Sequence, residues 1–289
     1  MTRLVRLTVL IAFSTLALAW SVGAQTVGSV LGLLATVDLS TLVPPNDPAL
    51  TDPAASEPAT TDPPHLPKGG VYFLFGTAKN DVDPQNPFNE VISFDTTGPT
   101  AVAGAFRRLG DQVKIGMLTN QVELKYFFTN SPTILIPRTC GGGSPRIQFG
   151  ISGDGDGNFN QFPGGPDQNV FGYLGDKPFG GGCPPDMWVH EDMTNDIPKW
   201  DLSQYATAGS GAFCTGTNPF TCTWAQMVLF LNTVFPNHRV VNANLVDDAS
   251  GNPFPAGRGC AYFDLVTTGA RTLNDHTDTS GGGQQPNNC

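Results

Sequence analysis

The sequence is poor in charge, in histidine and in the short motifs that mark many enzymes. Charged residues make up 14% of the chain, and there are four histidines among its 289 residues. It contains no Cys-x-x-Cys pair and no Gly-x-Ser-x-Gly motif, and its glycine runs lack the lysine of a phosphate-binding loop. These absences argue against a zinc site, a serine hydrolase and a nucleotide-binding protein.

Positive charge is also scarce. The chain has 15 Lys and Arg against 25 Asp and Glu, which gives a formal net charge of −10 at pH 7. Such a surface repels nucleic acid and anionic lipid. We therefore expect neither as a partner.

The first residues have the pattern of an export signal. Arg3 and Arg6 form a cationic start, residues 7–19 form an apolar stretch, and small residues precede a cleavage point after Ala24. This pattern predicts a signal peptide over 1–24 and a secreted or cell-envelope protein. If the signal is cleaved, we expect no stable membrane span; if it stays uncut, it becomes an anchor.

Beyond the signal, composition divides the chain into further parts. A short apolar segment with an acidic residue at Asp38 covers 25–43, and a Pro/Asp/Thr-rich linker with almost no large apolar side chains covers 44–68. Residues 69–273 should form one β-sandwich domain, and 274–289 a flexible tail unless its terminal cysteine is tied down.

Glycine and proline are abundant, at 34 and 25 residues, which is typical of loop-rich extracellular β proteins. Apolar residues mostly recur with a period of two, as in 122–129, where Val122, Leu124 and Tyr126 share one face. The same alternation predicts strands near residues 71, 90, 102, 112, 146, 170, 239 and 260. The predicted fold class is all-β: a two-sheet antiparallel β-sandwich, jelly-roll-like.

One segment has helical spacing instead. In 224–235, large apolar residues recur every three or four positions, Thr223 and Gln226 form a capping box, and Pro236 ends the segment. The sequence therefore predicts one short helix against the sheet.

Six cysteines in an exported chain predict disulfides. Cys214 and Cys222 flank a turn-rich segment and are the easiest pair to close. Six cysteines allow fifteen pairings, and the sequence does not decide among them; the pairs it suggests are Cys214 with Cys222, Cys140 with Cys183 from two glycine-rich loops, and Cys260 with the terminal Cys289.

Several blocks between residues 140 and 269 resemble a set found in secreted bacterial proteins of unknown function. They are CGGGSPRIQFGI, FGYLGDKPFGGGCPPDMW, WDLSQY and, after LVDDASG, GCAYFDLVTTG. The last strand also resembles those of galactose-binding-like and laminin-G-like sandwiches. This resemblance implies a β-sandwich, but fold analogy assigns neither a catalytic residue nor a ligand.

The segment 152–161, SGDGDGNFNQ, is the sharpest local signal. Oxygen-bearing residues occupy alternate positions in it: Asp154, Asp156, Asn158 and Asn160. Their oxygens can converge on a hard cation such as calcium, although Phe159 stands where an EF-hand loop needs glycine. The alternative is a solvated hairpin tip in which Asp and Gly serve turn geometry.

Acid/base catalysis has one weak set of candidates, His190, Glu191 and Asp192. Successive residues in a strand face opposite sides, so Glu191 and Asp192 would not act together there. Solvated loop charges are the alternative interpretation.

Sugar rings stack on aromatic side chains, and three aromatics in the loop-rich middle of the chain are candidates: Trp188, Trp200 and Tyr205. A core position is the alternative for each. We expect a non-catalytic binding module for a glycan or another cell-surface component, with calcium as a structural ion. A secreted glycan-active hydrolase or lyase and a purely structural surface protein are the alternatives.

Overall fold

A computed structural model describes most of the chain after residue 69. The described residues are 70–96, 101–110, 112–129, 140, 144–175, 181–215, 220–248, 259–281 and 289. The predicted signal peptide, apolar segment and linker, residues 1–68, lie outside them. No helix within the described ranges is long and apolar enough to cross a membrane.

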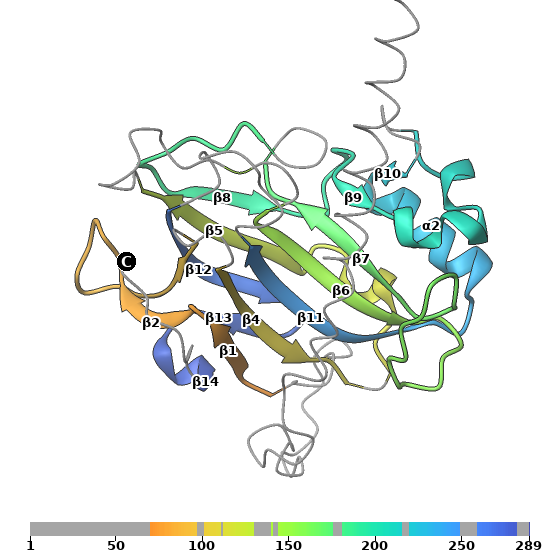
Figure 1. The fold of residues 1–289 in the computed structure, drawn as a ribbon, viewed down its shortest axis with the longest axis horizontal. Helices are drawn as coiled ribbons and strands as arrows, with labels where there is room; N and C mark the ends of the chain where they lie inside the picture. Colours follow the sequence, from red (N-terminus) through yellow and green to blue (C-terminus); the bar gives the residue numbers. More distant parts are fainter. Residues whose placement is uncertain are drawn as a thin grey trace, which may run out of the picture. The chain divides into compact units, whose positions relative to one another are not determined.

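The fold consists of two sheets (Figure 1). Across the larger sheet the strands are β10 (Thr221–Cys222), β9 (Trp200–Asp201), β7 (Gln168–Tyr173), β6 (Arg146–Ser152), β11 (Arg239–Asp248), β4 (Val102–Arg108), β1 (Tyr72–Gly76) and β14 (Thr279–Gly281). The smaller sheet contains β2 (Lys79–Val82), β3 (Glu90–Asp95), β12 (Cys260–Thr268), β5 (Val122–Phe128) and β8 (Val189–Asp192), with β13 (Thr272–Leu273) paired to β12. The β1–β14 pair is parallel and the other strand pairs are antiparallel.

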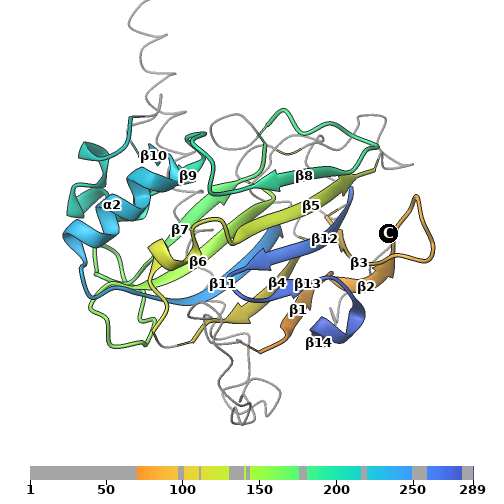
Figure 2. The same ribbon diagram turned by 180° about the vertical axis from the view of Figure 1, so that it is seen from behind.

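The sheets form two layers around one hydrophobic core (Figures 1 and 2). Phe149 and Leu245 from the larger sheet and Leu124 and Phe263 from the smaller one are at most 2% exposed and belong to the same cluster. Alternate residues of long strands such as β5 and β6 supply this core, as expected for half-buried strands. The predicted β-sandwich is confirmed.

All but one of the strands predicted from alternation are present. The exception is 112–118, where Ile115–Leu118 forms the 3₁₀-helix η2. Ile115 and Leu118 are both fully buried while Met117 is 43% exposed, so the buried positions repeat every three residues rather than every two. The predicted strand at this position is therefore wrong.

The predicted helix is α2, Trp224–Val234, and its capping box is formed. The Thr223 hydroxyl accepts a hydrogen bond from the Gln226 main-chain N–H, and the Gln226 side chain accepts from Thr223 N–H. Trp224 packs against Trp200, with ring centroids 5.1 Å apart. The helix therefore covers one end of the core.

All three expected cysteine pairs lie at disulfide distance. Their Cα atoms are 5.5, 4.4 and 5.5 Å apart for Cys140–Cys183, Cys214–Cys222 and Cys260–Cys289. Three such pairs fit an oxidising compartment.

The last part of the chain extends the fold past the predicted domain end at 273. His276–Asp278 forms the 3₁₀-helix η6, and β14 then pairs with β1 at the sheet edge. The part of the predicted 274–289 tail that is described thus belongs to the sandwich. Main-chain hydrogen bonds to a strand edge need no apolar side chains, which is why composition gave no sign of this strand.

Candidate functional site

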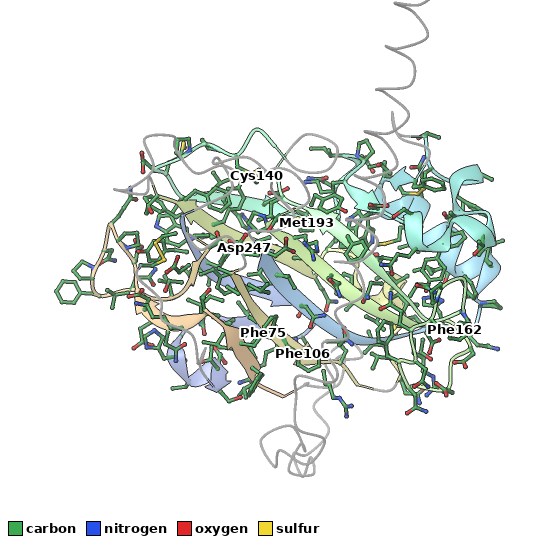
Figure 3. The ribbon with its side chains drawn as sticks, in the orientation of Figure 1. Phe75, Phe106, Cys140, Phe162, Met193 and Asp247 are labelled. Carbon is green, nitrogen blue, oxygen red and sulfur yellow. A yellow bond between two sulfur atoms is a disulfide. The ribbon has the colours of Figure 1, made fainter. Side chains whose placement is uncertain are left out.

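The loop between β6 and β7 folds back on itself at the end of the sandwich that carries α2 (Phe162 marks it in Figure 3). Gly155 has φ +78°, and a Cβ built on it would lie 2.3 Å from the carbonyl oxygen of Asn237. Glycine is therefore required for the loop to lie against the turn that follows α2.

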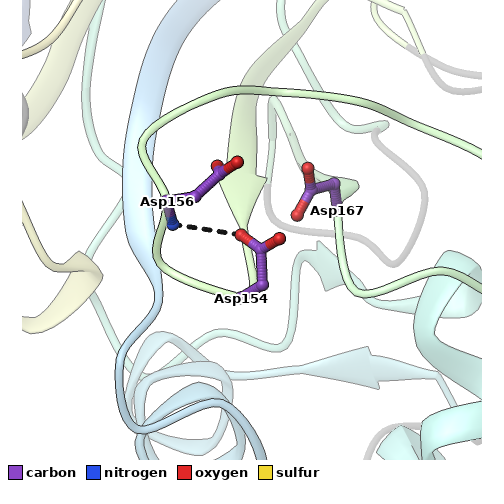
Figure 4. A group of neighbouring side chains, drawn as sticks. All are labelled: Asp154, Asp156 and Asp167. Atoms are coloured by element: carbon purple, nitrogen blue, oxygen red, sulfur yellow. Dashed lines mark hydrogen bonds between the residues drawn. The ribbon is translucent and has the colours of Figure 1, made fainter.

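Three carboxylates converge in this loop, Asp154, Asp156 and Asp167 (Figure 4). Each offers one oxygen, and these oxygens all lie within 4.8 Å of one another. Asp154 and Asp156 are exposed, whereas Asp167 is 2% exposed. Together they form the acidic cluster, the one group of three or more potential ligand side chains found among the described residues.

Two of the four predicted metal ligands, Asp154 and Asp156, belong to the acidic cluster. Asn158 instead donates its side-chain amide to Asp156 Oδ2, at 3.1 Å, and its main-chain N–H to Oδ1, at 2.7 Å. The main-chain N–H of Asn160 donates to Asp167 Oδ2, at 2.9 Å. Asn158 and the main-chain N–H of Asn160 therefore hold the carboxylates of the cluster in place by hydrogen bonds.

Asp167 was not predicted. It lies outside the alternating spacing and directly before β7, so only the folding back of the loop brings it to the cluster. Its Oδ1 accepts the main-chain N–H of Gly153, at 3.0 Å. The sequence signal available for it was an acidic residue just before a predicted strand, which is a weak one.

The environment shifts the pKa values of two of these carboxyls in opposite directions. Burial raises the pKa of Asp167, main-chain hydrogen bonds from Asn160 and Gly153 counteract this, and the charges of Asp154 and Asp156 raise it further. Hydrogen bonds from Asn158 lower the pKa of the exposed Asp156. The ionised cluster therefore concentrates negative charge that a cation would stabilise.

A polar pocket of about 400 Å³ adjoins the acidic cluster. Its lining consists of Gln112, Lys114, Asp154, Gly155, Asn237 and Arg239. Asp154 therefore belongs both to the cluster and to the pocket wall. Gly155 comes from the same loop, Gln112 and Lys114 from the segment before η2, and Asn237 and Arg239 from the turn after α2 and the start of β11.

His238 holds these two segments together. It is fully buried, its Nε2 accepts the main-chain N–H of Ile115 at 3.2 Å, and its Nδ1 donates to the carbonyl oxygen of Phe235 at 2.7 Å. These partners require the neutral Nδ1–H tautomer, and burial lowers the pKa of His238. Its neighbours in space and sequence, Lys114 and Arg239, are thereby placed at the pocket.

The predicted acid/base residues all lie on β8, where the side chain of Glu191 faces the opposite side from those of His190 and Asp192. Glu191 is 8% exposed, pairs with Lys199 Nζ at 2.5 Å and accepts the main-chain N–H of Gly175. His190 faces the other way and lies 3.0 Å from Glu123, while Asp192 accepts from Thr194. The three side chains form no common site: successive strand residues point to opposite faces, so Glu191 faces away from the other two, and His190 and Asp192 each bond to a different neighbour.

Two of the three predicted sugar-stacking aromatics are core residues. Trp200 is fully buried and stacks on Phe149, with ring centroids 5.6 Å apart, and Tyr205 is 1% exposed. The prediction of ligand contact is wrong for both, since neither ring faces solvent. Trp188 is half-buried, donates its indole N–H to Asp83 and contacts Phe127.

Comparisons of this chain with models of protein families, with curated proteins and with solved structures found no match. The resemblance to secreted bacterial sandwich proteins stays a prediction. The acidic cluster and the polar pocket are the features of the described residues that bear on function.

Proposed function

We propose that this protein is a non-catalytic, calcium-dependent glycan-binding module of the secreted or cell-envelope class. The observation that carries the proposal is the position of Asp154, which is shared by the acidic cluster and the polar pocket. A cation bound by the cluster would lie at the pocket wall, where it can contact a ligand.

The cluster suits calcium by its donor set. Calcium takes six to eight oxygen ligands and accepts flexible geometry. Three carboxylates leave coordination positions for water or for sugar hydroxyls, and two of the three, Asp154 and Asp156, are exposed to solvent. The amide side chains of Gln112 and Asn237 supply hydrogen-bond partners for further hydroxyls.

The location outside the cytoplasm rests on two features. The first residues have the composition of a signal peptide. The three cysteine pairs at disulfide distance are typical of proteins from oxidising compartments.

The hydrolase alternative lacks a matching site among the described residues. Glu191, one of its candidate residues, is buried in an ion pair with Lys199, and among the described residues no second carboxylate faces it across a pocket. Nor does a specific observation favour a purely structural role.

The test is a glycan-array screen of the full chain, produced in an oxidising compartment, with calcium and with a chelator. We expect hits that require calcium and that weaken at least about tenfold in Asp154→Asn and Asp156→Asn. Asp196→Asn removes an exposed carboxylate outside the cluster and should bind as the wild type does. Hits that persist in chelator would contradict the role of calcium, and a blank array would contradict glycan binding.

A further inference from the structure

The charges of the polar pocket bear on which glycans it would select. Its side chains comprise two cations, Lys114 and Arg239, two amides and one carboxylate. No aromatic side chain lines it among the described residues. A neutral pyranose usually depends on such a ring for stacking, so this pocket lacks the usual means of holding one.

Neither cation forms an ion pair with a carboxylate of the described residues. Elsewhere in the described chain, Arg146 pairs with Asp248 and Arg271 with Asp278, at 2.7 and 2.9 Å. No such ion pair involves Lys114 or Arg239 within the described residues. Both cations therefore keep charge and donors for a ligand.

Lys114 is held in place without being neutralised. Its Nζ donates to the carbonyl oxygen of Pro236 at 2.7 Å, which uses one of three donors. On the opposite segment, Arg239 follows the buried His238, which ties that segment to Ile115. The fold thus presents an ammonium and a guanidinium at one pocket in a protein of net charge −10.

From these features we infer that the ligand is an acidic sugar, one that carries a carboxylate, such as a uronic-acid residue. This inference rests on the proposed function and names its substrate class. The carboxylate would pair with Arg239 and Lys114, and neighbouring hydroxyls would complete the coordination of calcium at Asp154. With calcium bound, the positive charges at the site outnumber the three carboxylates of the acidic cluster. A guanidinium and a carboxylate form short, charge-assisted hydrogen bonds.

The experiment compares an oligogalacturonate of defined length with its methyl ester, which keeps the sugar framework but removes the charge. Binding to the full chain is measured by calorimetry with calcium present. We expect the acid to bind at least about tenfold more tightly than the ester. Lys114→Gln and Arg239→Gln should each weaken binding of the acid about fivefold, and added salt should weaken it further.

The matched control is Lys125→Gln, which removes one positive charge from the smaller sheet, outside the pocket. It should leave binding unchanged. Equal affinities for acid and ester, or equal effects of Lys114→Gln and Lys125→Gln, would overturn the inference while leaving calcium-dependent glycan binding in place. A blank glycan array would instead remove the proposed function itself.

Discussion

Two acidic regions of this protein differ in how their charge is neutralised. On β8, Glu191 is buried against Lys199 and the N–H of Gly175, so the chain supplies its own cation. In the acidic cluster, hydroxyl and N–H groups approach the carboxylates, and no lysine or arginine of the described residues forms an ion pair with them. The first arrangement stabilises the fold, and the second is suited to an external cation.

The largest effect should come from breaking the internal pair. Lys199→Met leaves Glu191 as an uncompensated charge in the interior, and we expect the free energy of unfolding to fall by about 3–5 kcal/mol. Urea denaturation measures this. The double variant Lys199→Met/Glu191→Gln should recover most of the loss, since glutamine still accepts from Gly175. If the single variant is as stable as Asp196→Asn, the pair does not stabilise the fold.

The second-largest effect should come from disturbing the loop geometry that brings the carboxylates of the acidic cluster together. Gly155→Ala adds a Cβ at φ +78° that clashes with Asn237, whereas Gly209→Ala adds one at φ +81° with nothing within 4 Å. Both variants incur left-handed strain of about 1 kcal/mol. Only Gly155→Ala should lose a further ~1–2 kcal/mol and weaken calcium binding. Equal thermal stabilities of the two variants would show that the contact with Asn237 is dispensable.

The pH dependence of calcium stabilisation should sharpen the comparison. The folded pKa of Asp167 lies above its unfolded value of 3.8, so without calcium its contribution is greatest below that value and is lost as pH rises through the folded pKa. Bound calcium would stabilise the ionised form of the Asp167 carboxyl. The calcium-induced rise in Tm should therefore be larger at pH 7 than at pH 4, and Asp196→Asn should behave like the wild type. A rise independent of pH would contradict this account.

The smallest effect concerns the pocket. Because the folded pKa of His238 is lowered from 6.5, its contribution to stability is present above pH 6.5 and declines as pH falls through the folded value. His238→Gln should flatten this part of the curve of unfolding free energy against pH. If His238→Gln leaves the curve of unfolding free energy against pH unchanged, a group other than His238 causes this part of the pH dependence.

Much of the fold was predictable because it depends on local patterns. Period-two alternation located β5 and β11, and the Thr223–Gln226 box located α2. The 3₁₀-helix at Ile115–Leu118 was not predicted because its apolar residues are spaced both two and three positions apart. The burial of Leu118 in the structure shows that the spacing of three applies. Strands as short as β9 and β10 carry too few residues to show any period.

The site was predictable in part. Alternation along one loop identified Asp154 and Asp156, whereas Asp167 joins them through the return of the loop. The pocket could not be found, because Lys114 and Arg239 are more than one hundred positions apart and meet through the contact of His238 with Ile115. Trp200 and Tyr205 show the converse, since side chains suited to a ligand also suit a core.

The most direct test of the account is calorimetric titration of calcium into the chelator-treated full chain, beside Asp154→Asn. We predict one calcium site with a Kd of about 10⁻⁴ to 10⁻³ M, as in extracellular modules, and loss of the binding heat in the variant. A wild-type titration with no more heat than that of Asp154→Asn would contradict the assignment of the acidic cluster as a cation site.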